Sequence, residues 1–308
     1  MSVPSSHDER REAASPEPAS TSGWSELVVS DVVSVDGGGP ANALLELEHV
    51  RRAGADVALV RFNRPESLNP IDKDTIAALA WLLETFMSLD AALVPDAVVL
   101  TGKGRAFSAG GDLKGYQTLY RDPERFRRFM DDFETVCALL ETMSSVTVAM
   151  VNGPCVAGGL ELALACDLVT IADSAGIGDG HLNFAQLPGA GSSQRLVKAI
   201  GSAWATQWLL TGRLYSAEEA ERTGLIALRA PDEELLERTL TMVADIARHT
   251  PLGREKMKKL ISIADNSPLE DGLKLEKDLV FDYATTSHDV VEGLNAFAEK
   301  RPANYLGR

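Results

Sequence analysis

An apolar run that passes through a turn and a pair of glycines into a helix most constrains how this chain can fold. Residues 146–151, VTVAMV, predict a buried strand, and the turn residues NGP follow at 152–154. Gly158 and Gly159 then precede a helical pattern at 160–165. Two glycines at the start of a helix let another molecule approach the backbone, because no Cβ is in the way. The first amides of the helix have no partner within it, so they can donate hydrogen bonds to an incoming oxygen.

A carboxylate lies close to these amides in the sequence. Glu161 follows Gly158 by three residues, about one helical turn, so its side chain can face the same spot. Amide donors beside a carboxylate are the groups that can stabilise an oxyanion while a proton moves.

A second strand and glycine-rich loop have the same character. Residues 97–102, AVVLTG, predict a short strand. Residues 103–114, KGRAFSAGGDLK, follow as a loop with lysine and arginine on both sides. The chain therefore carries two candidate sets of backbone donors, each placed directly after a buried strand.

Four motifs in this order make the chain resemble the crotonase superfamily, the enoyl-CoA hydratase/isomerase family. Two are the loops above, which look like the two halves of the family's oxyanion hole. The others are FNRPESLN at 62–69 and LPGAG at 187–191, with QRL at 194–196. The resemblance covers roughly residues 44–308 and implies an α/β fold, a crotonase-like ββα superhelix with a C-terminal helical oligomerisation region. Relatives form trimers and dimers of trimers through that region, so we expect a homotrimer or homohexamer.

The resemblance also implies roles for particular residues. The amides of Gly111 and Gly158 would hold the thioester oxygen as an enolate forms, and Glu161 would be the main acid or base. Asp112 is better suited to holding its loop than to proton transfer. The expected contacts to the coenzyme A part of the substrate are Arg64, Ala109, Gly111, Asp112, Leu113, Lys114 and Gly158, with Lys103 and Arg105 nearby.

The second acidic residue of the family is where this sequence departs from the pattern. Hydratases have a glutamate seven residues before the proline of the Pro-Gly-Ala-Gly motif, and counting back from Pro188 gives His181. A histidine can act as acid or base near neutral pH, and Asp179 can orient its imidazole on an extended segment. A hydrogen-bonded loop histidine without a catalytic role is the alternative interpretation.

The resemblance fixes the class of substrate, a coenzyme A thioester, better than the reaction. We expect an enoyl-CoA hydratase or dehydratase, with no tightly bound cofactor and no metal. Double-bond isomerisation, thioester hydrolysis and carbon–carbon lyase chemistry are the alternatives within the superfamily. A protein that binds acyl-CoA without catalysis is a further alternative, because the carboxylate pair is half missing.

Composition excludes several classes of function. The 308 residues are 45% apolar and 24% charged, as in ordinary globular proteins, and no apolar run approaches the roughly 20 residues that span a bilayer. The polar N-terminus lacks the apolar segment of a secretory signal, so we expect a cytoplasmic protein without membrane contact. A net charge of −15 opposes nucleic-acid binding, including the RNA binding known in one branch of the superfamily. Cys137, Cys155 and Cys166 lack metal-site or CxxC spacing and are expected to be reduced packing residues.

The domain organisation follows from composition and periodicity. We expect a disordered extension at 1–40, a crotonase-fold core at 41–240 and a C-terminal helical region at 241–308. The other expected elements are a hairpin (44–50 and 57–62), strands at 168–172 and 225–228, and helices at 72–89, 123–143, 192–210 with a break at Gly201, and 216–224.

Overall fold

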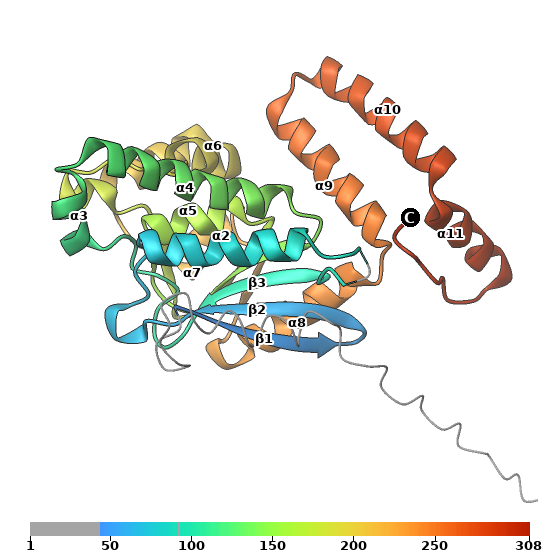
Figure 1. Ribbon diagram of the computed structural model, residues 1–308, viewed down its shortest axis with the longest axis horizontal. Coiled ribbons are helices and arrows are strands. Elements are labelled where there is room, and N and C mark those ends of the chain that lie inside the picture. The colour runs from blue at the N-terminus through green and yellow to red at the C-terminus, as the bar shows by residue number, and fades with distance from the viewer. Residues whose placement is uncertain (1–43, 92) are drawn as a thin grey trace, which may run out of the picture.

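The computed structural model describes residues 44–91 and 93–308 of the chain, so the expectation for residues 1–40 lies outside the described part. Within it, strands alternate with helices as far as α8, and only helices follow (Figure 1). The main sheet has the strand order β1-β2-β3-β4-β6-β9. Its strands are β1 (Leu45–Arg52), β2 (Ala55–Phe62), β3 (Ala97–Gly102), β4 (Val146–Val151), β6 (Leu168–Ala172) and β9 (Leu228–Ala230).

The predicted hairpin is confirmed, with a tighter turn than expected. Strands β1 and β2 pair antiparallel from Leu45↔Phe62 to Arg52↔Ala55. Only Ala53 and Gly54 remain for the turn, and both have positive φ, 47° and 90°. This is the two-residue turn whose twist matches that of a hairpin.

The remaining strands of this sheet are parallel, from β2 through β3, β4 and β6 to β9. Buried parallel strands read as continuous apolar runs, which is why 146–151 and 168–172 were predicted with the bounds that the structure has. The carboxyl ends of parallel strands meet at one edge of a sheet. The loops after β3 and β4 therefore emerge side by side, at the edge where α/β proteins usually bind ligands.

A second, three-stranded sheet was not predicted. It has the order β5-β7-β8 and consists of β5 (Cys155–Val156), β7 (Gly176–Gly178) and β8 (Tyr215–Ser216). Strands of two or three residues carry no periodicity, so tertiary contacts alone define them. This sheet brings the segment after β4 next to the segment that leads to His181.

Helices cover the main sheet on both sides. The helices α2 (Lys73–Met87), α4 (Pro123–Thr142) and α5 (Gly158–Ala165) contact one another in sequence and form one layer. On the opposite side α8 (Leu235–Ala247) packs against β4, β6 and β9 (Figure 1). The predicted cap of α2 is present, because the Asp72 side chain accepts a hydrogen bond from the Thr75 amide.

Most helix predictions beyond α5 are confirmed, and one strand prediction is wrong. Helix α6 (Ser192–Thr211) is broken at Gly201, which has a φ of 76°, and α7 (Ala217–Arg222) begins with the predicted capping box. The strand expected at 225–228 instead begins at Leu228 and ends at Ala230. Residues 225–227 connect α7 to it, and the residues in register with β6 begin at Leu228.

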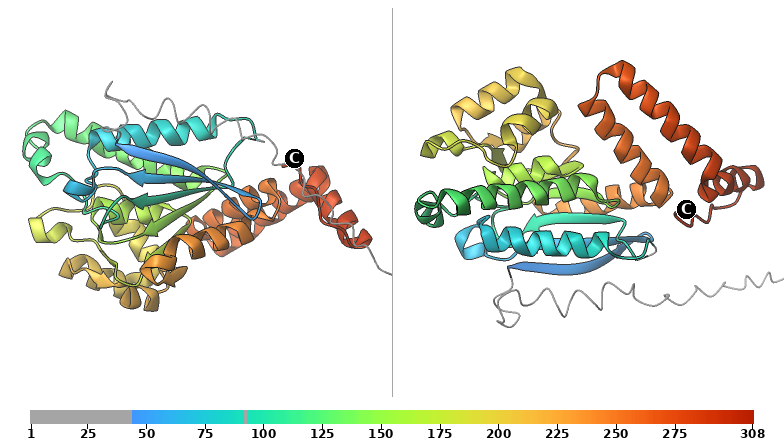
Figure 2. Two further views of the ribbon diagram at one scale, coloured as in Figure 1. Left: turned by 90° about the horizontal axis from the view of Figure 1, so that it is seen from below. Right: turned by 45° about the horizontal axis from the view of Figure 1, so that its top comes forward.

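The last three helices stand away from the sheet (Figures 1 and 2). They are α9 (Pro251–Asn266), α10 (Leu269–Thr286) and α11 (His288–Glu299), called here the C-terminal arm. The division expected between residues 240 and 241 falls inside α8, which packs on the sheet. We propose to place it between α8 and α9. Two charged residues of α9 fix the arm to the core, Arg254 on Asp96 and Lys258 on Asp167.

Candidate active site

The two glycine-rich loops lie against each other. Residues Ser108 and Cys155 form a parallel bridge, in which the Val156 amide donates to the Ser108 carbonyl at 2.9 Å. Gly110 is in direct contact with the second loop, because a Cβ placed on it would lie 2.9 Å from the Ala157 Cβ and 3.6 Å from Gly158 N. The sheet therefore brings together the loops that the sequence predicted as one site.

Two backbone amides at this contact keep their hydrogen free. Gly158 is the first residue of α5, where amides have no intrahelical acceptor. Within the described residues, neither the Gly158 amide nor the Gly111 amide donates a hydrogen bond, whereas the neighbouring amides of Ala109 and Gly110 do. Ala157, just before Gly158, has a φ of 51° and a ψ of −115°, a sparsely populated conformation that the surrounding contacts must hold in place.

Glu161 is buried in the first turn of α5 and is held by one of its two oxygens. Its Oε1 accepts hydrogen bonds from the amides of Ala190 (2.7 Å) and Ser192 (3.2 Å) at the start of α6. The other oxygen, Oε2, lies 3.9 Å from Nε2 of His181. The carboxylate is therefore fixed in direction and presents a single oxygen to the imidazole.

The backbone before His181 is a turn and not the extended segment that we expected, although the expected contact forms. Gly180 is left-handed and His181 begins a short 3₁₀ helix, η3 (His181–Phe184). Nδ1 of His181 lies 3.0 Å from Oδ2 of Asp179, and the His181 amide donates to Oδ1 at 3.2 Å. Because a carboxylate only accepts, Nδ1 carries the hydrogen and Nε2 of the neutral ring faces Glu161 with its lone pair.

Burial and neighbouring charges shift the pKa values of Glu161, His181 and Asp179. Burial raises the pKa of Glu161 above its ordinary value, against the opposing effect of His181 and of its backbone donors. Burial would lower the pKa of His181, but the hydrogen bond with Asp179 and the charge of both carboxylates raise it overall. The pKa of Asp179 is lowered, because its bonds to His181 and Ser192 outweigh its burial. Perturbed acid and base groups in contact are typical of a site that transfers protons.

Ser192 is a member of this cluster that the sequence analysis missed. Its hydroxyl donates to Oδ2 of Asp179 at 2.6 Å, and its amide donates to Glu161. The only signal in the sequence is its position directly after the Pro-Gly-Ala-Gly motif. An Asp, a His and a Ser also form the triad of serine hydrolases, but there the serine bonds to the histidine. Here it bonds to the aspartate, so this arrangement does not activate Ser192 as a nucleophile.

Aromatic side chains from α3 (Leu113–Leu119) and α4 line the outer side of the loops. A Cβ on Gly111 would lie 2.1 Å from the Tyr116 hydroxyl, and one on Gly158 would lie 3.3 Å from Phe133. Phe129 connects them, with ring centroids 5.9 Å from Tyr116 and 6.1 Å from Phe133. Burial and nearby acidic groups raise the pKa of Tyr116, so its hydroxyl stays neutral.

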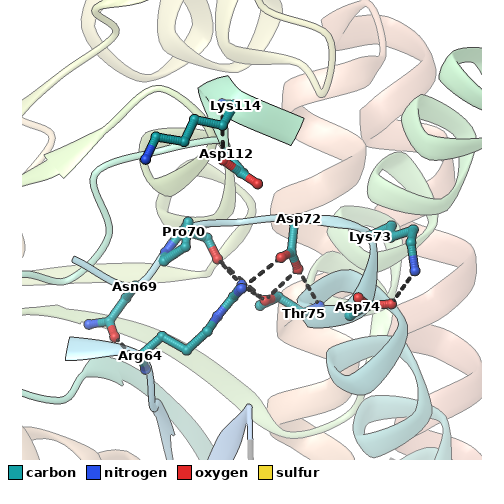
Figure 3. A network of polar contacts seen from close by, with 9 residues as sticks. All are labelled: Arg64, Asn69, Pro70, Asp72, Lys73, Asp74, Thr75, Asp112 and Lys114. Carbon is teal, nitrogen blue, oxygen red and sulfur yellow. Dashed lines mark hydrogen bonds and ion pairs between the residues drawn. The ribbon is translucent and has the colours of Figure 1, made fainter. Parts of the chain in front are cut away.

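The guanidinium of Arg64 is engaged within its own loop (Figure 3). It pairs with Asp72 at 2.7 Å, donates to the Pro70 carbonyl at 2.6 Å and bonds to the Thr75 hydroxyl. These contacts lower the pKa of Asp72 in spite of its burial. The segment after the first strand pair is thereby tied to the start of α2.

The other residues expected to contact coenzyme A lie on the exposed side of the loop at 103–114, which follows β3. Asp112 caps α3, because its side chain accepts from the Lys114 amide. The side chains of Ala109, Leu113 and Lys114 are exposed, and Lys114 points away from the Arg64 network (Figure 3). Lys103 pairs with Glu46 at 2.8 Å. Their contact with a coenzyme A group stays a prediction.

The described part of the chain shows neither a group of His, Cys, Asp or Glu side chains suited to a metal ion nor a helix long and apolar enough to cross a membrane. All three cysteines are free thiols, and Cys137 and Cys155 are fully buried.

Comparison with known proteins gives one consistent result. Residues 52–308 match the family model described as enoyl-CoA hydratase/isomerase. A putative enoyl-CoA hydratase of Thermus thermophilus is 37% identical over 81% of this chain and 97% of its own length. The mitochondrial enoyl-CoA hydratase of Pongo abelii is 33% identical over 81% of this chain and 83% of its own length. The crystal structure of an enoyl-CoA hydratase from Bacillus anthracis has a TM-score of 0.79 at 31% identity and covers 86% of this chain and 100% of its own.

The predicted crotonase-like fold is confirmed by these structures, and so is the resemblance drawn from the four motifs. The chain belongs to the enoyl-CoA hydratase/isomerase family, a family of acyl-CoA enzymes within the crotonase superfamily.

Proposed function

We propose that this chain catalyses the addition of water to a 2-enoyl-CoA thioester, or the reverse dehydration. The observation that carries the proposal is the pair of proton-transfer groups, Glu161 Oε2 and His181 Nε2, which face each other at 3.9 Å. That separation is too long for a direct hydrogen bond, and it suits two groups that both contact one water molecule. Three relatives and neighbours at 31–37% identity are named enoyl-CoA hydratases, which supports this reaction over its alternatives.

In the proposed reaction the two amides stabilise the negative charge and the two side chains transfer protons. The Gly111 and Gly158 amides hold the thioester oxygen while negative charge grows on it. Glu161 accepts a proton from water as the water oxygen bonds to the β carbon. Protonated His181 then delivers a proton to the α carbon, which restores the thioester carbonyl. The proton that Glu161 accepted then passes to His181, which restores both groups. Overall, one O–H bond of water and the C=C π bond are broken and one C–O and one C–H bond are formed, so no further reactant is needed.

Double-bond isomerisation is the second candidate, and the burial of the pair favours it. The side chains of Glu161 and His181 are only 3% and 11% exposed. Two groups sheltered from water can remove a proton from one carbon and return it to another without adding water. The substrate class, coenzyme A thioesters, is the same for both reactions.

The proposal is tested by the turnover of the purified full chain with enoyl-CoA thioesters of increasing acyl-chain length. The loss of enoyl absorbance measures this turnover. E161Q and H181A are expected to lower kcat by about 100-fold or more, because each removes a proton-transfer group. Both should leave the affinity for the CoA ester, measured by calorimetry, nearly unchanged. If the wild type interconverts 3-enoyl and 2-enoyl thioesters but adds no water, isomerisation replaces hydration. If it binds esters and converts none of them, the chain is a binding protein.

We also propose that the chain assembles into a homotrimer or homohexamer through the C-terminal arm. Large apolar side chains are exposed on this one region, including Leu269 (78%), Phe281 (72%) and Phe297 (86%), and apolar side chains gathered in one region of a surface are typical of an association surface. Light scattering is expected to give three or six times the chain mass of 33.1 kDa. A monomer would contradict this proposal. The expected cytoplasmic location stays a prediction.

A further inference from the structure

The first residue of α6, Ser192, contacts both acidic members of the catalytic cluster. It is fully buried, with 0% of its surface exposed. Its amide donates to Oε1 of Glu161 at 3.2 Å, and its hydroxyl donates to Oδ2 of Asp179 at 2.6 Å. One residue therefore links α5 to the loop that carries the histidine.

These bonds complete a ring of four residues. Oδ2 of Asp179 accepts from the Ser192 hydroxyl and also from Nδ1 of His181, at 3.0 Å. The opposite nitrogen of the imidazole returns to Glu161 across the gap of 3.9 Å. Hydrogen bonds close the ring on every side but this one, and the open side is where the two proton-transfer atoms face each other.

We propose that Ser192 is a positioning residue that sets the distance and orientation of Glu161 relative to His181. It fixes the carboxylate through its amide and fixes the imidazole through Asp179. The inference rests on the proposed function only in taking Glu161 and His181 as the proton-transfer pair.

The chemistry of the position explains why a hydroxyl is needed there. Asp179 is 1% exposed, and a carboxylate this deeply buried needs several donors. Any residue but proline supplies the amide at position 192, whereas the bond to the aspartate comes from the serine hydroxyl. Without it, Oδ2 of Asp179 keeps more of its charge for His181, so the pKa of His181 rises. The imidazole of His181 also loses a restraint on its orientation, because Asp179 is held less firmly.

Other charged or titratable groups surround this cluster and stay the same when Ser192 is changed. His181 faces the two carboxylates, Asp179 and Glu161. Three titratable groups on neighbouring helices interact electrostatically with Glu161. They are Tyr116 of α3, Cys137 of α4 and Arg195 of α6.

The test compares S192A with S193A in the full chain. Ser193 is the adjacent, partly exposed serine, whose hydroxyl accepts only from Gln194 within the described residues. The readouts are the pKa of His181 from an NMR titration of its ring protons and the steady-state kinetics with an enoyl-CoA. For S192A we expect a raised His181 pKa and a kcat lower by about tenfold, the worth of one hydrogen bond to a charged group, with KM within about twofold. S193A should match the wild type in all three.

A second pair of variants separates positioning from folding. S192T keeps the hydroxyl, and S192V has the same shape as S192T but carries a methyl group in place of the hydroxyl. Only S192T should therefore have the His181 pKa of the wild type. An unaltered His181 pKa in S192A and S192V would overturn the inference. If the pKa shifts as expected but the wild type has no turnover, the proposed function fails and the coupling through Ser192 stands.

Discussion

Asp179 and His181 are two residues apart, and their side chains meet at 3.0 Å between Oδ2 and Nδ1. Gly180, between them, makes this possible with a φ of 70°. The carboxylate assigns the hydrogen of the neutral ring to Nδ1 and turns the basic nitrogen toward Glu161. A histidine held in this way can replace a carboxylate as an acid or base, which a freely rotating loop histidine does less well.

The pH dependence of turnover should report this contact. Asp179 raises the pKa of His181, so D179N is expected to move the His181 limb of the kcat/KM profile to lower pH. A group with a raised folded pKa stabilises the protein below its ordinary pKa, about 6.5 for histidine, and this stabilisation is lost as pH rises through the folded value. D179N should therefore also reduce the extra stability below pH 6.5. D173N, at an exposed aspartate paired with Arg229, is the control and should shift neither. A profile of D179N identical to that of the wild type would contradict the assignment.

Glu161→Gln should make the protein more stable while it removes activity. Burial raises the pKa of Glu161, so its ionised form is disfavoured in the folded state. Such a group lowers stability once the pH exceeds its ordinary pKa. A glutamine keeps an oxygen to accept from the amides of Ala190 and Ser192 and carries no charge. Thermal unfolding at pH 7.5 should show a higher midpoint for E161Q than for the wild type, and the difference should shrink toward pH 4. A lower midpoint at pH 7.5 would refute this account.

Gly110→Ala should push the two loops apart. The new Cβ would lie 2.9 Å from the Ala157 Cβ and 3.0 Å from the Val156 carbonyl, at a φ of 95°. A displacement of this kind near the reacting atoms typically costs about 10- to 100-fold in kcat. Gly54→Ala is a matched control, since Gly54 has a φ of 90° with nothing within 4 Å of the new Cβ. It should share the backbone strain of about 1 kcal/mol and keep full activity. Equal kcat values for the two variants would show that turnover does not depend on the contact between the loops.

Arg64→Ala should lower stability by about 1–3 kcal/mol, because it leaves Asp72 partly buried without its cation. Arg61 is the control, with a similar side-chain exposure (23% against 25% for Arg64) but an exposed partner, Glu48. R61A is expected to change the free energy of unfolding by less than about 1 kcal/mol. Urea unfolding of both variants measures the difference. If R64A weakens CoA-ester binding and leaves stability unchanged, Arg64 acts on the substrate and not on its loop.

The cysteines are expected to be inert in the folded protein. Burial raises the pKa of the Cys137 thiol to about 12, and it also raises the pKa of Cys155 and Cys166. The thiolate is the reactive form, so a disulfide reagent at pH 8 should modify none of them quickly. All three should react after denaturation, which the release of coloured thiolate measures. Fast modification before unfolding would show that a cysteine is accessible.

The parts of the fold that the sequence predicts are those with a continuous or periodic apolar pattern. Strand β4 is one, and the amphipathic helices α2 and α4 are others, with an error of one or two residues at their ends. The strands of the small sheet were missed because each pairing extends over only two residues and joins segments that are distant in the sequence. Their position depends on tertiary contacts, which local patterns do not contain.

The candidate site shows the same division. Glu161 and His181 were found by their spacing from motifs, and the structure brings them together. Ser192 was missed because its role depends on the contact between α5 and α6. That contact joins residues 31 apart in the chain. The expected extended segment at Asp179 was wrong because the left-handed Gly180 turns the chain there.

The anchors of α9 have a mechanical consequence. Lys258 binds Asp167 and the carbonyls of Met143 and Ser145, and Arg254 binds Asp96. Asp96, Ser145 and Asp167 each directly precede a strand of the parallel sheet. These contacts attach the arm at the edge of the sheet opposite the glycine-rich loops, and a further hydrogen bond joins Lys198 of α6 to Asn266 of α9. Strands β3, β4 and β6, together with α6, are therefore the elements through which a displacement of the arm would reach the candidate site.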